Sequence, residues 1–93
     1  MITDEQWDDI AKKIFALPGM RTEADSDCII EDDEADGETY IKFMSDHGVT
    51  DDHNGTTFAA YLTANGCVLE QSRARSMMVP TADLVRLFGY QQV

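Results

Sequence analysis

Hydrophobic positions near the start of the chain repeat with the period of a helix. The apolar residues between Trp7 and Ile14 stand three or four positions apart, which places them on one face of an α-helix. Thr3 and Gln6 precede this stripe at the spacing of a capping box, in which each side chain bonds the backbone of the other residue. Pro18-Gly19 then stops the element. The pattern predicts an amphipathic N-terminal helix.

A different pattern occupies residues 28–44. Cys28–Ile30 is a short apolar run, and Thr39–Met44 is rich in strand-forming residues that partly alternate between apolar and polar. Asp36-Gly37, between the two runs, is typical of a two-residue type I′ turn. We expect a β-hairpin with an acidic tip.

Residues 56–71 fit two structures. One is a second hairpin, with strands at Thr57–Thr63 and Cys67–Gln71 turned by Asn65-Gly66. The other is a short helix over Phe58–Ala64 that ends at the same glycine. We favour the hairpin, because apolar residues partly alternate along its first strand.

The C-terminal part predicts one more strand and one more helix. Met77–Val79 is expected to form an edge strand that ends at Pro80. Thr81 is expected to cap a helix whose apolar side includes Leu84 and Phe88. Together the elements predict a single α+β domain over residues 1–93: an N-terminal amphipathic helix, a small antiparallel sheet of three to four strands and a short C-terminal helix.

Length and composition agree with one folded domain. The chain has 93 residues, and its apolar fraction of 43% is near the value of ordinary globular proteins. No apolar run approaches the roughly 18 residues that a membrane span needs, and we expect no signal peptide before the first helix. Cys28 and Cys67 form no C-x-x-C motif. We expect a cytoplasmic protein with both thiols reduced and buried as small core residues.

Charge is the feature that sets this chain apart. The net charge is −11, from 18 acidic and 7 basic residues. Residues 1–52 hold sixteen acidic and four basic residues, whereas residues 53–93 hold two acidic and three basic. Such a surface disfavours direct binding to nucleic acid or to an anionic membrane, since both require basic residues.

The acidic residues are densest in one stretch. Residues 23–38 hold nine carboxylates and no base. Charge runs are common as solvated faces, and a fixed array of carboxylates can also serve as a contact surface for a basic partner. In an extended segment Glu23, Asp25 and Asp27 would share a face at intervals of about 6.5–7 Å. That interval is comparable in scale to the spacing of phosphates along a nucleic-acid strand.

The motifs of metal sites and enzymes are incomplete. Asp32 to Gly37 resembles the start of a calcium-binding loop, but Phe43 stands where the bidentate acid is required. His47 and His53 stand six residues apart without a supporting zinc pattern. The chain has no phosphate-binding loop and no G-x-S-x-G sequence. We expect no catalytic residues, no metal and no cofactor.

In size, acidity and the carboxylate array of residues 23–38, the chain resembles the small acidic inhibitors encoded by phages and mobile elements, which include anti-CRISPR and anti-restriction proteins. The resemblance implies a non-enzymatic protein that binds a basic, nucleic-acid-binding surface of a partner protein and inhibits it, as a DNA mimic does. The expected contact residues are the acids of the first half of the chain: Glu23, Asp25, Asp27, Glu31, Asp32, Asp33, Glu34, Asp36 and Glu38, with Asp4, Asp8, Asp46, Asp51 and Asp52.

A second hypothesis uses the other half of the chain. In it, the protein is a small structural or regulatory domain that self-associates through Met77-Met78 and the terminal helix. The sequence leaves the oligomeric state open.

Overall fold

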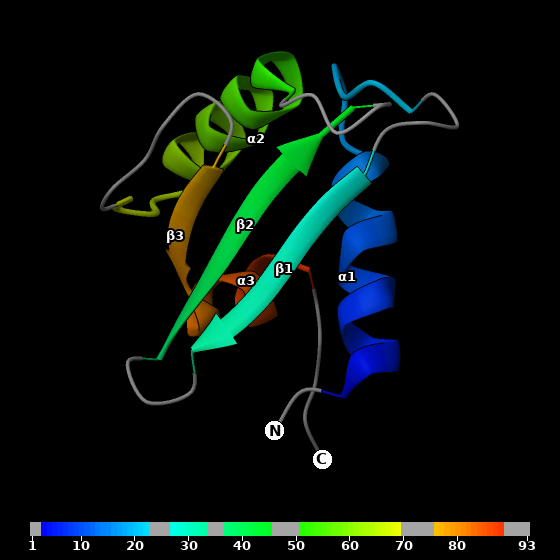
Figure 1. Ribbon diagram of the computed structural model, residues 1–93. Coiled ribbons are helices and arrows are strands. Elements are labelled where there is room, and N and C mark those ends of the chain that lie inside the picture. Colours follow the sequence, from blue (N-terminus) through cyan, green and yellow to red (C-terminus); the bar gives the residue numbers. More distant parts are fainter. Residues whose placement is uncertain (1–2, 23–26, 34–36, 46–50, 70–75, 89–93) are drawn as a thin grey trace.

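The computed structural model describes residues 3–22, 27–33, 37–45, 51–69 and 76–88. Its elements follow one another as helix, two strands, helix, strand and helix (Figure 1). Their bounds are α1 Asp4–Phe15, β1 Asp27–Asp33, β2 Glu38–Met44, α2 Asp52–Ala64, β3 Ser76–Pro80 and α3 Thr81–Leu87. The α+β class predicted from the sequence is confirmed, with an N-terminal helix, an antiparallel sheet and a short C-terminal helix.

Helix α1 begins as its sequence predicts. The Gln6 backbone N–H donates to Thr3 Oγ1 at 3.2 Å, and the Thr3 backbone N–H donates to Gln6 Oε1 at 2.7 Å. These reciprocal bonds form a capping box, which satisfies two backbone donors at the helix start. At the other end, Lys13 Nζ donates to the Phe88 carbonyl oxygen at 2.9 Å and so ties α1 to the end of α3.

The described sheet has the order β1-β2-β3, and both pairings are antiparallel. The predicted hairpin is present, but its predicted two-residue turn is wrong. Asp33 pairs with Glu38, so four residues separate the strands. Gly37 is the last of the four, and its φ of +65° is a conformation that favours glycine.

The predicted second hairpin is also wrong, because residues 52–64 form helix α2. The helix starts within the expected loop, where Asp51 is its N-cap and Asp51 Oδ1 accepts from the Asn54 N–H. Gly66 follows the C-cap Asn65 with a φ of +86°. A left-handed glycine at this position ends a helix, so Asn65-Gly66 is a helix stop and not a hairpin turn.

Strand β3 and helix α3 follow each other directly. The predicted edge strand is confirmed, and Pro80 is its last residue. Thr81, however, is the first residue of α3 and not its cap, since Pro80 holds the N-cap position. The Thr81 hydroxyl instead lies 2.7 Å from the hydroxyl of Thr39 on β2, which joins the start of the helix to the neighbouring strand.

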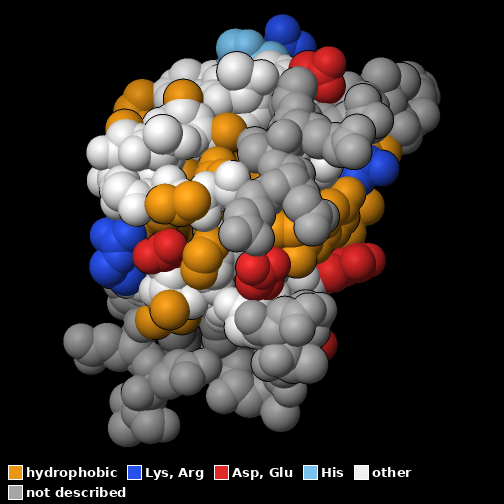
Figure 2. All heavy atoms as spheres, turned by 90° about the vertical axis from the view of Figure 1, so that its left-hand side faces the viewer, with side chains coloured by type: hydrophobic (Ala, Val, Ile, Leu, Met, Phe, Trp, Pro, Cys, Tyr) orange, Lys and Arg blue, Asp and Glu red, His pale blue; other side chains and the backbone are white. Residues whose placement is uncertain are grey.

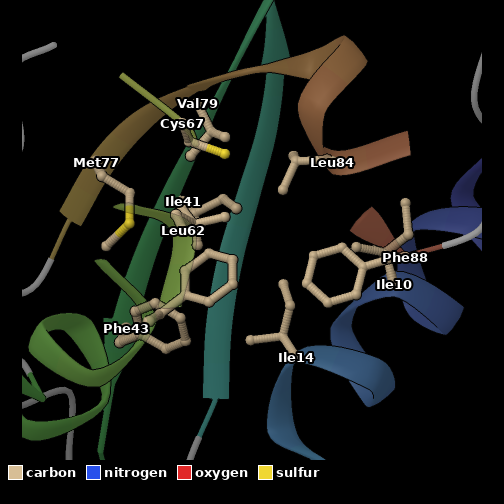
Figure 3. Packing of buried hydrophobic residues seen from close by; sticks show 11 residues of the cluster. Ile10, Ile14, Ile41, Phe43, Leu62, Cys67, Met77, Val79, Leu84 and Phe88 are labelled. Atoms are coloured by element: carbon tan, nitrogen blue, oxygen red, sulfur yellow. The ribbon is translucent and has the colours of Figure 1, made fainter. Parts of the chain in front are cut away.

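All three helices contribute to one core on one face of the sheet (Figure 3). Residues of β2 alternate between buried and partly buried, as expected when only one face is covered. The side chains that fill this core are Ile10, Ile14, Ile41, Phe43, Phe58, Leu62, Cys67, Met77, Val79, Leu84 and Phe88. On the uncovered face, Ile29 of β1 is 43% exposed.

Phe58 gives a test of α2 and its packing. Its ring is fully buried and contacts the rings of Phe43 and Phe88 at centroid distances of 5.6 and 6.2 Å. We expect Phe58→Ala to lower the free energy of unfolding by about 3–5 kcal/mol, measured by urea denaturation. Thr56→Ala, at an exposed position of the same helix, should change it by less than about 0.5 kcal/mol. Equal effects of the two substitutions would contradict this packing.

Candidate functional site

Helix α1 presents an exposed row of carboxylates. Asp4, Glu5, Asp8 and Asp9 are all exposed. Asp9 lies 3.6 Å from Lys13, one turn further along the helix. The other described ion pair joins Asp83 to Arg86 within α3, so among the described residues no base pairs with the three remaining acids of α1.

Strand β1 adds carboxylates at the adjacent edge of the sheet. Asp27 and Glu31 are exposed and stand four residues apart on an extended strand, on the same face. The Cys28 N–H donates to Asp27 Oδ1 at 2.8 Å, and this bond holds the carboxylate against its own strand. Glu38 of β2 is partly exposed and pairs in register with Asp33. We call Asp4, Glu5, Asp8, Asp27 and Glu31 the acidic surface.

Several of the predicted contact residues lie outside the described residues, so they add nothing to the geometry. These are Glu23, Asp25, Glu34, Asp36 and Asp46. Asp32 and Asp33 have a described backbone, which pairs with Thr39 and Glu38, but their side chains lie outside the description as well.

Asp51 does not belong to any exposed surface. Its residue is only 4% exposed, its N–H donates to the Phe43 carbonyl oxygen at 3.0 Å, and its Oδ1 caps α2. Its Oδ2 is buried and has no hydrogen-bond partner in the described part of the chain. The prediction that Asp51 faces a partner is therefore wrong, because the carboxylate is needed at the helix start. Asp52, the next residue, is exposed.

The start of α2 also forms hydrogen bonds with the segment that follows α1, at Gly19 and Arg21. The buried Asn54 accepts from the Arg21 N–H at 2.7 Å and donates from Nδ2 to the Arg21 carbonyl oxygen at 3.2 Å. His53 Nε2 lies 2.8 Å from the Gly19 carbonyl oxygen. The chain after α1 is thus bound at two points, and His53 serves a structural contact.

A pocket lies between α1 and the outer strand β1, with a volume of about 270 Å³. Carboxylates and apolar side chains line it together: Asp4, Trp7, Asp8, Ala11, Asp27, Cys28 and Ile30. Figure 1 shows that α1 runs beside β1, at the opposite end of the sheet from β3. Sequence reasoning assigned Trp7 and Ala11 to the core stripe alone; only the packing of helix on strand brings them to one pocket with Asp27.

Both cysteines are free thiols, as predicted. Cys67 is buried in the core, and Cys28 is partly buried against it. Burial, and secondarily the negative charge of Asp27, raises the pKa of the Cys28 thiol to about 12. Burial likewise raises the pKa of Cys67. Both thiols are therefore protonated near neutral pH, and a protonated thiol is a poor nucleophile and a poor metal ligand.

The structure buries part of the surface that the self-association hypothesis requires. Met77 is fully buried in the core, and so are Leu84 and most of Phe88 in the terminal helix. Met77 therefore cannot be a contact residue. Figure 2 shows the face on the β3 side, where the acidic and basic side chains of the described residues are scattered among hydrophobic ones.

The described part of the chain shows neither a metal-binding cluster nor a membrane-spanning helix. It contains no group of three or more histidine, cysteine or acidic side chains placed to hold a metal ion. None of its helices combines the length and the hydropathy needed to cross a membrane. Comparison of the chain with models of protein families, with curated proteins and with solved structures finds no match.

The raised pKa of Cys28 predicts that its thiol is alkylated slowly. A rise from 9.0 to about 12 lowers the thiolate fraction at pH 8 by about a thousandfold. We expect alkylation of Cys28 by iodoacetamide, followed by mass spectrometry of its peptide, to be far slower in the folded protein than in 8 M urea. Asp27→Asn should speed the reaction of the folded protein, because removing the neighbouring negative charge lowers the thiol pKa. Equal rates with and without urea would contradict the assignment.

Proposed function

We propose that the protein binds a basic, nucleic-acid-binding surface of a partner protein through its acidic surface and thereby excludes nucleic acid from that surface. One observation carries the proposal: the neighbouring elements α1 and β1 both expose carboxylates, and the described basic residues pair with none of the five that make up the acidic surface. A net charge of −11 would then act mainly through this side of the molecule.

The rigidity of the acidic surface supports a role as a mimic of a nucleic-acid backbone. Asp4 and Asp8 are one turn apart on a capped helix, which separates them by about 5–6 Å. Asp27 and Glu31 are on a strand that is paired along its length. Carboxylates on fixed elements lose little conformational entropy when they meet lysines and arginines, so more of the attraction remains as affinity.

Because the proposed interaction is electrostatic, its association rate and its salt dependence can be predicted. Charge complementarity speeds the encounter of two proteins and excludes partners of the same sign. At physiological ionic strength the attraction reaches only about 8 Å, so salt should weaken it strongly. Loss of nucleic acid from the partner would follow directly, because both ligands would need the same basic residues.

Neutralising the acids of β1 tests the proposal. Asp27→Asn with Glu31→Gln raises the net charge by two and keeps the acceptor that Asp27 offers to the Cys28 N–H. Proteins retained from a lysate by the immobilised chain at low and high salt would be purified, and their DNA or RNA binding measured with and without the chain. We expect a partner that releases nucleic acid when the chain is added, and about tenfold weaker binding by the double variant.

The matched control adds the same charge elsewhere. Ala60→Lys with Val68→Lys also raises the net charge by two, at exposed positions away from α1 and β1. This control should bind the partner nearly as well as the unmodified chain. If both double variants lose binding equally, only net charge matters; if the retained proteins keep their nucleic acid, the inhibitory role is wrong.

A further inference from the structure

The pocket between α1 and β1 combines features that seldom occur together on a solvated acidic face. Asp4 and Asp8 of α1 and Asp27 of β1 are among the residues that line it, so three acidic residues border one concave site. All the residues that line it are described, and none of them is basic. The negative charges therefore have no counterion from the pocket's own walls.

The remaining walls are apolar. Trp7, Ala11 and Ile30 line the pocket, and the fourth side chain is the Cys28 thiol, which is uncharged near neutral pH. A small metal ion would gain nothing from these walls, because hard cations require oxygen ligands on most sides. The lining matches instead a ligand that has a cationic end and an apolar or planar body.

We propose that this pocket binds an arginine side chain of the partner protein. The inference rests on the proposed function, since it names the contact at which the acidic surface is anchored. The guanidinium lies against the Trp7 ring and beside the carboxylates of Asp4 and Asp8, while the methylene stem covers Ala11 and Ile30.

Arginine fits this site better than lysine for physical reasons. The guanidinium is planar, it is weakly hydrated, and it stacks on aromatic faces. Its five donors can reach two carboxylates at once, here those of Asp4 and Asp8, which are one turn apart on α1. The lysine ammonium is a compact, strongly hydrated charge, and it would have to lose its water against apolar walls.

The positions of the carboxylates are set before any ligand arrives. The capping box fixes the first turn of α1, which carries Asp4. The bond from the Cys28 N–H to Oδ1 fixes Asp27 and leaves its other oxygen without a described partner. A site organised in this way gains affinity, because ordering its side chains on binding costs little.

Trp7 is the single tryptophan of the chain and provides the measurement. Its fluorescence would be followed during titration with a nona-arginine peptide and, separately, with a nona-lysine peptide, in moderate salt. We expect a saturable change with nona-arginine and about tenfold weaker binding of nona-lysine. The absence of a saturable change with nona-arginine would overturn the proposal, as would equal affinity for the two peptides.

The chain offers a closely matched pair of charge variants. Asp4→Asn with Asp8→Asn removes two charges from the pocket, whereas Asp9→Asn with Asp52→Asn removes two from exposed positions outside both the pocket and the acidic surface. Both pairs change the net charge by two, and each removes one acid from the first turn of a helix. We expect about tenfold weaker nona-arginine binding for the first pair and less than about twofold for the second.

A variant without any change of charge completes the test. Ala11→Met keeps a good helix former and fills the pocket, so it should weaken nona-arginine binding while circular dichroism shows an unchanged fold. Equal losses for the two charge variants, or no loss for Ala11→Met, would show that arginine binds the acidic surface without using the pocket. The proposed function would survive that result, because displacement of nucleic acid from the partner tests it separately.

Discussion

The burial of Ile10 and Ile14 against the sheet is the interaction on which the acidic side of the molecule depends. Both side chains are fully buried, so they fix the rotation of α1 about its axis. A helix turns by about 100° per residue, and this rotation therefore decides where every other residue of α1 points. It brings Asp4 and Asp8 to the pocket beside β1, while Glu5 and Asp9 are exposed and do not line it.

The sequence predicted those elements whose signals are local. The capping box of α1 needs only Thr3 and Gln6, and edge strand β3 is bounded by its own proline. The second hairpin was a wrong prediction because Phe58 and Leu62 fit either period. The decisive helix signal lay upstream at Asp51, where a run of polar residues is equally typical of a loop. Tertiary contacts settled the choice, since one face of α2 fills the core.

Less of the candidate site than of the fold could be predicted from the sequence. The charge polarity of the chain could be counted, and it led to Asp4 and Asp8 of α1 and to Asp27 and Glu31 of β1, but it did not single out Glu5. The same count included Asp51, whose carboxylate is buried as a helix cap, because a charge count cannot separate a capping role from an exposed one. The pocket was not predicted, because its walls come from a helix and a strand whose relative placement no local sequence pattern encodes.

An acidic surface of this kind costs the protein stability. Carboxylates held near one another repel, and the two described ion pairs lie within single helices and leave the acidic surface unpaired. The stability must come from the core, where eleven hydrophobic residues from all three helices, strands β2 and β3 and the segment after α2 are buried. A charge arrangement that weakens the fold, yet is carried on a capped helix and a paired strand, is more readily explained by a binding role than by solubility alone.

Long-range attraction and the pocket would contribute in different ways to such binding. The acidic surface attracts any basic protein, and salt screens it over a Debye length of about 8 Å. Attraction of this range speeds encounter but selects poorly among partners, whereas a few anchored side chains dominate the affinity of most interfaces. A guanidinium that packs on Trp7 beside Asp4 and Asp8 would be partly shielded from salt. The pocket would therefore turn a general attraction for basic surfaces into recognition of one that presents an arginine at the right place.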